Sequence, residues 1–67
     1  MNLSIKQIEN AIKNSAKFNG TNEEYNTVKN NADEAIIEVG KQVHKTEHYF
    51  TQSDWKKVYQ NIQSKIA

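Results

Sequence analysis

The sequence predicts an all-α protein that folds as a compact three-helix bundle. Apolar residues recur at steps of three and four, the spacing that places them on one face of a helix. A helix-start signal occurs three times, each with a hydroxyl side chain followed three residues later by a side chain able to complete a capping box. The chain has no Pro and only two Gly, so it has few of the turn-forming residues that a fold of many strands needs. Its 67 residues make one domain, residues 1–67, near the lower size limit for folding without a metal or a disulfide.

The first predicted helix runs from Ile5 to Lys17. Residues 4–7 match the capping-box pattern at its start, and Leu3 precedes the cap as the partner of Ile8 in a hydrophobic staple. Gly20 follows the helix, where a left-handed conformation can close it. The residues expected on its inward face are Ile5, Ile8, Ile12 and Ala16.

The second predicted helix lies in the longest periodic stretch, residues 21–50. Thr21 and Glu24 form its capping box. Gly40 costs this helix roughly 1 kcal/mol relative to Ala but need not end it, and we expect the helix to fade between residues 45 and 49. Asn31 is a weak point, because a break there would give a bundle of four helices. The apolar stripe consists of Tyr25, Val28, Ala32, Ala35, Ile36, Val39 and Val43.

The third predicted helix runs from Gln52 to Lys65. Thr51 and Asp54 make the third capping box, with Asp as the short substitute for Glu, and Phe50 pairs with Trp55 as a second staple. The inward residues are Trp55, Val58, Tyr59, Ile62 and Ile66. Each of the three predicted helices has one apolar stripe, and packing the helices into a single bundle buries all three stripes. The alternative is a helical hairpin that completes its core by dimerising.

Composition limits the function classes. The chain contains no Cys, so disulfides and thiolate zinc sites are excluded. No run of apolar residues is long enough to span a membrane, and the N-terminal residues lack a secretory pattern, so we expect a cytoplasmic location. The formal net charge is +1, and every cationic residue is Lys. Lys cannot reproduce the planar fork with which Arg reads guanine or clamps phosphate, so the absence of Arg disfavours nucleic-acid recognition.

Charge is segregated along the chain. Residues 21–40 have a net charge of −4, whereas residues 1–20 carry +2 and residues 41–67 carry +3. We interpret this as an acidic middle helix attracted to two basic neighbours. Abundant Lys, Asn and Ile without Arg indicate an AT-rich coding genome, as in many bacteria and phages.

The segment from His44 to His48 matches the metal-binding pattern H-x-x-E-H. Histidines four residues apart share a helix face and can bind zinc, with the intervening Glu as a general base. However, such a site needs a third ligand and a substrate cleft, which a chain of this size cannot easily build. We therefore expect no catalytic residue, no metal site and no cofactor.

Nucleic-acid binding is the alternative function, that of a small DNA-binding regulator. Beyond Asp54 the third helix has no acidic residue, and its polar face carries side chains able to contact phosphates and base edges. These candidates are Lys56, Lys57, Gln60, Asn61 and Gln63.

Protein–protein interaction is the function that we favour. In a continuous second helix, Ile37 points away from the stripe that Ile36 joins, beside a Gly that permits close backbone approach. The candidate contact residues on this outer face are Ile37, Gly40, Lys41, His44 and His48. We expect a small adaptor or inhibitor that binds another protein, acting as a monomer or homodimer without a membrane.

Overall fold

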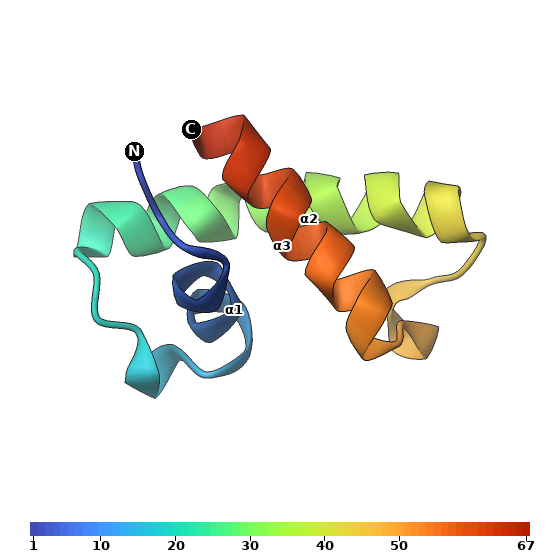
Figure 1. Ribbon diagram of the computed structural model, residues 1–67, viewed down its shortest axis with the longest axis horizontal. Coiled ribbons are helices and arrows are strands. Elements are labelled where there is room, and N and C mark those ends of the chain that lie inside the picture. The colour runs from blue at the N-terminus through green and yellow to red at the C-terminus, as the bar shows by residue number, and fades with distance from the viewer.

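The computed structural model describes residues 1–67, and all of its regular secondary structure is helical (Figure 1). Its α-helices are α1 (Ile5–Lys13), α2 (Asn22–Val43) and α3 (Gln52–Ile66). Two short 3₁₀ helices, η1 (Ser15–Lys17) and η2 (Glu47–Tyr49), lie in the connections. The predicted all-α fold with three packed helices is thereby confirmed.

All three predicted capping boxes are present. The side chains of Ser4, Thr21 and Thr51 each accept a hydrogen bond from the backbone N–H three residues later. In return, the backbone N–H of each cap residue donates to the side-chain oxygen of that later residue. At α3, the Thr51 N–H donates to Asp54 Oδ2 at 3.0 Å and the Asp54 N–H donates to Thr51 Oγ1 at 3.2 Å. Each helix therefore begins where a side chain satisfies backbone donors that would otherwise lack partners.

The first helix is shorter than predicted. α1 ends at Lys13, because Asn14 leaves the helical conformation at φ −151°, and the following residues form η1 instead. Ala16 is consequently exposed rather than inward, and Ala11 takes a buried position on α1. The prediction of a helix up to Lys17 was wrong by one turn.

The middle helix is continuous through the Asn pair, so the four-helix alternative is excluded. Asn31 donates from its side-chain amide to the Thr27 carbonyl at 2.8 Å, and the Thr27 hydroxyl donates to the Glu23 carbonyl at 2.9 Å. These polar side chains bond back to the helix that carries them instead of capping a new one.

The C-terminus of α2 is set by Gly40 and His44. His44 adopts the left-handed conformation at φ 59° and ψ 42°, and its N–H donates to the Gly40 carbonyl. The Lys45 N–H donates to the same carbonyl at 3.1 Å, which makes a Schellman-type ending. The helix was predicted to fade between residues 45 and 49, and it stops earlier because this reversal closes it.

Replacing His44 by Gly should stabilise the protein. A left-handed conformation strains any residue with a Cβ, and removing that strain outweighs the extra freedom that Gly gives the unfolded chain. We expect the free energy of unfolding to rise by about 0.5 to 1 kcal/mol, the left-handed strain less the entropy cost of Gly, measured by urea denaturation. The matched control, Gln42→Gly, lies in the last right-handed turn and should lose about 1 kcal/mol. A loss in both variants would contradict the role assigned to His44.

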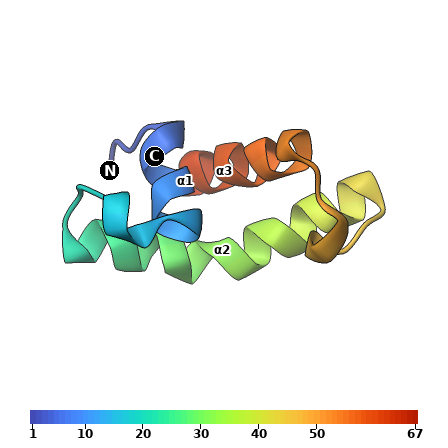
Figure 2. The ribbon, with the colours of Figure 1, turned by 90° about the horizontal axis from the view of Figure 1, so that it is seen from below.

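The helices form two layers. α2 spans the molecule, whose longest extent is 33 Å, and 22 residues at 1.5 Å each account for about that length. α3 crosses α2 and shares with it the largest helix–helix interface, while α1 packs beside α3 at a steep angle to α2 (Figures 1 and 2). The two chain ends lie on the same side of the molecule (Figure 1).

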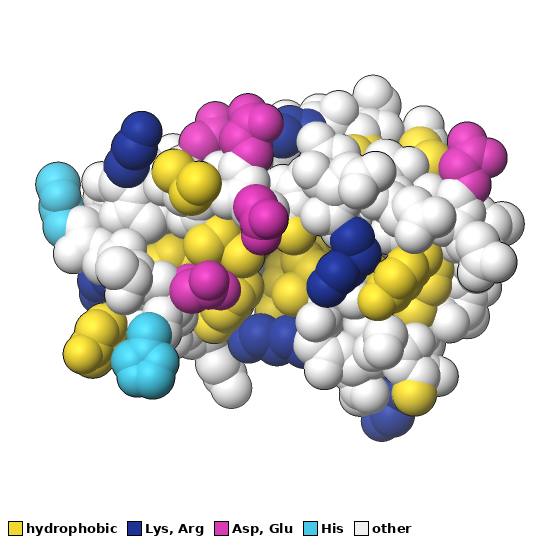
Figure 3. Space-filling view, turned by 180° about the vertical axis from the view of Figure 1, so that it is seen from behind, with side chains coloured by type: hydrophobic (Ala, Val, Ile, Leu, Met, Phe, Trp, Pro, Cys, Tyr) yellow, Lys and Arg dark blue, Asp and Glu magenta, His cyan; other side chains and the backbone are white.

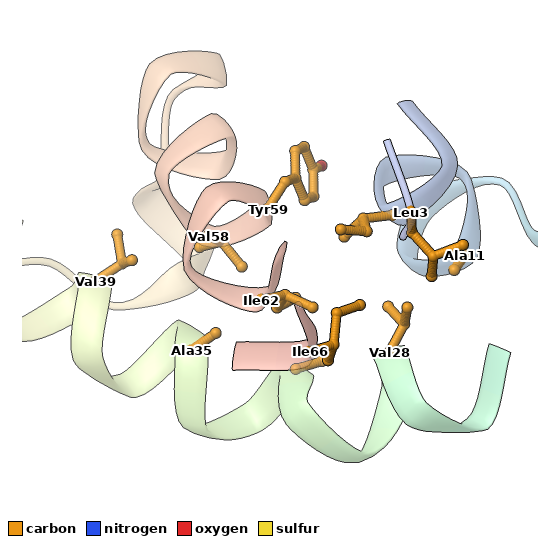
Figure 4. Packing of buried hydrophobic residues seen from close by; sticks show 11 residues of the cluster. Leu3, Ala11, Val28, Ala35, Val39, Val58, Tyr59, Ile62 and Ile66 are labelled. Atoms are coloured by element: carbon orange, nitrogen blue, oxygen red, sulfur yellow. The ribbon is translucent and has the colours of Figure 1, made fainter. Parts of the chain in front are cut away.

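One hydrophobic core joins the three helices (Figure 4). Its fully buried large side chains come from every helix: Ile8, Val28, Val39, Val58 and Ile62. Leu3 is buried with them. The Gln63 side-chain amide of α3 donates to the Leu3 carbonyl at 3.0 Å and so ties the N-terminal segment to α3. At the C-terminal end of α3, Lys65 pairs with Glu34 and Glu38 of α2, as the segregation of charge predicted for these two helices, whereas no ion pair joins α1 to α2. None of the helices combines the length and apolar character needed to cross a membrane.

Candidate functional site

The connection between α2 and α3 is held by contacts at both of its ends. The Phe50 and Trp55 rings meet edge to face with centroids 5.3 Å apart, which is the predicted staple. Lys45 Nζ donates to Asp54 Oδ2 at 2.9 Å, and Asp54 is only 6% exposed although it also completes the cap of α3. Side-chain contacts therefore hold the connection at both of its ends.

Acid should weaken this arrangement. The hydrogen bond from Lys45, helped by those from Thr51, lowers the pKa of Asp54 below its ordinary value of 3.8. A carboxyl with a depressed folded-state pKa contributes stability above its unfolded pKa and loses it as the pH falls through the folded value. We expect the unfolding free energy to drop as the pH is lowered past 3.8, and Lys45→Gln to reduce that drop. Urea titrations across this range, with exposed Lys41→Gln as control, measure the effect, and equal acid sensitivity in both variants would contradict it.

A hollow lies on the outer surface of this connection. It has a volume of about 410 Å³ and is lined by the C-terminal half of α2 and the start of the connection. Ile36 and Ile37 form its apolar part, and Ile37 is 58% exposed. Figure 3 shows hydrophobic side chains gathered in the middle of this face, with lysine and acidic side chains around them. Tyr49 of η2 is 71% exposed.

The predicted partner-binding residues are brought together in part. Ile37, Gly40 and Lys41 all line the hollow. His44 closes α2, and His48 lies in η2 against the Tyr49 ring, with centroids 5.1 Å apart. The premise that these two histidines share a helix face is wrong, because α2 ends at Val43.

Gly40 was expected to permit close approach of a partner, but the structure gives a different reason for a Gly at this position. A Cβ at this position would lie 2.8 Å from the Lys45 carbonyl oxygen. The close backbone approach that Gly40 permits is thus that of the returning chain itself. The missing side chain nevertheless leaves one wall of the hollow open, since Gly40 is among its lining residues.

The H-x-x-E-H pattern does not produce a helical pair of ligands. His44 and His48 are separated by the end of α2, with His44 in the left-handed conformation. No group of three or more His, Asp or Glu side chains is placed so that it could hold a metal ion.

The predicted nucleic-acid-binding residues are divided between two sides of α3. Lys57, Gln60 and Asn61 line a shallow hollow of about 540 Å³ between α2 and α3. Lys56 lies instead toward α1, and Gln63 is engaged with the Leu3 carbonyl.

A groove between α1 and α3 was not predicted from the sequence. It has a volume of about 410 Å³, and its walls include Ile5, Trp55 and Tyr59. Lys13 Nζ lies 4.5 Å from the centroid of the Trp55 ring in a cation–π contact. The Tyr59 hydroxyl is buried without a hydrogen-bond partner in the protein. Burial, with a smaller effect of the Glu9 carboxylate, raises the pKa of Tyr59 to about 12, so this hydroxyl remains a donor at neutral pH.

Sequence reasoning missed the groove because it depends on how α1 crosses α3. The only signal available was a set of aromatic residues on the third helix, and Trp55 and Tyr59 were assigned to the core. Both do contact the core, but Trp55 is only half-buried and leaves surface at the groove.

The chain matches no protein-family model, no curated protein and no solved structure.

Proposed function

We propose that this chain is a small adaptor or inhibitor, without enzymatic activity, that works by binding another protein. We place it in the cytoplasm of a bacterium, encoded by the host or by a phage, as a monomer or homodimer. The binding surface is the face formed by the C-terminal half of α2 and the connection to α3, hereafter the α2 face.

The observation that carries the proposal is the exposure of Ile37 at the edge of the hollow on this face. A single exposed apolar side chain is common in monomeric proteins. Here it borders a depression with an apolar wall, and Tyr49, in the connection that follows α2, is exposed as well. An aliphatic anchor, a pocket beside it and an exposed aromatic residue are the usual elements of an interface centre.

The rigidity of this face adds support. The Schellman-type ending of α2, the Lys45–Asp54 pair and the Phe50–Trp55 staple all anchor the ends of the connection. A surface that is already ordered loses little conformational entropy when it binds, so more of the contact energy remains as affinity.

Ile37→Asp tests the proposal directly. The protein should remain folded, because Ile37 is outside the core, yet binding to the partner should weaken by about thirtyfold or more, the effect of losing an interface hot spot. The assay is affinity capture of partners from the native host with tagged protein, treated or untreated with nuclease, followed by titration of the recovered partner.

Asn26→Asp is the matched control. It places the same charge on the same side of α2, about 16 Å away along the helix axis, at an exposed position. Partner binding should survive this change and nuclease treatment. Retained binding by Ile37→Asp would show that another surface is used, and capture lost on nuclease treatment would favour nucleic acid.

DNA binding is the second candidate, and its support is the grouping of Lys57, Gln60 and Asn61 in one hollow. Lys65 lines the same hollow, but its charge is offset by Glu34 and Glu38. With so few free cations, a mobility-shift titration on random duplex should show only weak, salt-sensitive binding. Tight binding abolished by Lys57→Ala would replace the protein-binding proposal.

A further inference from the structure

The groove between α1 and α3 has the composition of a site for an anion attached to an apolar group. Ile5, Trp55 and Tyr59 supply apolar walls, while Lys13 and Lys56 bring two positive charges to its lining. Neither lysine makes an ion pair within the protein. Glu9 is the one acidic residue in the lining, and its carboxylate lies 3.9 Å from Lys6 Nζ.

The buried Tyr59 hydroxyl is the further feature that favours an occupant able to accept a hydrogen bond. Gln52, at the first position of α3, lies in the lining, so the groove reaches backbone near the N-terminus of that helix, although the Asp54 carboxylate already caps this end. Tyr59 is only 4% exposed, and its hydroxyl has no hydrogen-bond partner in the protein. Figure 4 shows its ring pointing from α3 toward α1, with the hydroxyl at the tip. A buried donor without a partner is costly unless something accepts its hydrogen bond.

We infer that this groove binds an acidic segment of the partner protein, with a carboxylate at Lys13 and Lys56 and an apolar side chain against Ile5. The inference rests on the proposed function and adds the chemistry of the partner. Charge complementarity supports it, because the segments that supply both walls are basic overall. The groove volume of about 410 Å³ suits one large side chain and its neighbours.

A nucleic-acid strand fits the groove less well. Stacked bases need an open aromatic face, but Lys13 lies over the Trp55 ring and Tyr59 stacks near it, at an interplanar angle of 23° and a centroid distance of 6.3 Å. A stacked base would have to displace the lysine that is needed for its phosphate.

The test uses the full-length protein and the emission of its single Trp. The probe is an acetylated, amidated pentapeptide with two acidic residues on each side of a phenylalanine. Its control has the acidic residues replaced by their amides. We expect a saturable change in Trp55 emission with the acidic peptide, and at least about tenfold weaker binding of the amide peptide, as expected when charge-assisted hydrogen bonds are lost.

Matched lysine variants locate the site. Lys13→Gln combined with Lys56→Gln should weaken binding of the acidic peptide by at least about tenfold. Lys17→Gln combined with Lys29→Gln removes the same net charge from exposed positions outside the groove and should leave binding unchanged. Tyr59→Phe should keep the fold and weaken binding severalfold. Equal losses in both double variants, or equal binding of the two peptides, would overturn the inference.

Two other occupants are separate outcomes of the same experiment. Stronger binding of a short oligothymidine than of the acidic peptide would overturn the inference in favour of nucleic acid. Concentration-dependent dimerisation in sedimentation, abolished by the groove double variant, would show that the groove holds a second copy. If the captured partner binds the groove variant normally, the inference fails while the proposed function stands. Failure to capture any partner refutes the proposed function itself.

Discussion

Replacing Ile62 by Ala is expected to cost about 2 to 5 kcal/mol of unfolding free energy. Ile62 has no exposed surface and lies in the centre of the core between α3 and α2 (Figure 4). Its truncation removes buried apolar atoms and leaves a cavity that a closely packed core closes only in part. Because a domain of this size is stabilised by only about 3 to 5 kcal/mol, much of the mutant protein should be unfolded at room temperature.

Urea denaturation followed by circular dichroism measures this loss, and Ile37→Ala supplies the matched control. It deletes the same atoms from α2 at a position that is 58% exposed. Its cost should stay below about 1 kcal/mol, because little burial is lost and Ala is the better helix former. Similar losses in the two variants would mean that Ile62 is not the centre of the core.

The helix starts could be predicted from the sequence because their determinants are local. The boxes at Ser4, Thr21 and Thr51 each bond groups only three residues apart, and all three are confirmed. The same applies to the Phe50–Trp55 staple. Interactions of such short range are encoded in a few adjacent letters.

The helix ends could not be predicted with equal success, because they depend on where the chain must turn to pack. α1 stops at Lys13 rather than Lys17, and α2 stops at Val43, where His44 takes the left-handed position that Gly or Asn usually fills. The useful sign was Gly40, four residues earlier, where the absence of a Cβ admits the Lys45 carbonyl.

The candidate surfaces were predictable only where they lie on one helix. Ile37, Gly40 and Lys41 were placed together correctly, since all three belong to α2. The Lys45–Asp54 pair crosses a connection, and the α1–α3 groove combines residues about forty positions apart, such as Lys13 and Trp55. Periodicity describes one helix at a time, so contacts set by helix crossing lie beyond it.

Gly40→Ala should destabilise the protein although Ala is the better helix former. The propensity difference favours Ala by about 1 kcal/mol. Against it, the new Cβ would lie 2.8 Å from the Lys45 carbonyl oxygen, closer than such atoms approach in proteins. The Lys45 backbone cannot easily shift away from the new Cβ. Its N–H donates to the Gly40 carbonyl, and the Lys45 ammonium pairs with the Asp54 carboxylate.

The clash should prevail, with a net loss of about 1 to 2 kcal/mol, the usual range for overpacking. Thermal and urea denaturation measure it, and Gln42→Ala is the control, since it adds helix propensity at an exposed site in the same turn and should be neutral or slightly stabilising. The loss should also appear as weaker acid dependence, because a displaced Lys45 no longer pairs well with Asp54. A gain of about 1 kcal/mol would instead show that the propensity of Ala prevails. The backbone at Lys45 would then yield to the new Cβ, and the connection that shapes the α2 face would be less rigid than a preformed binding surface requires.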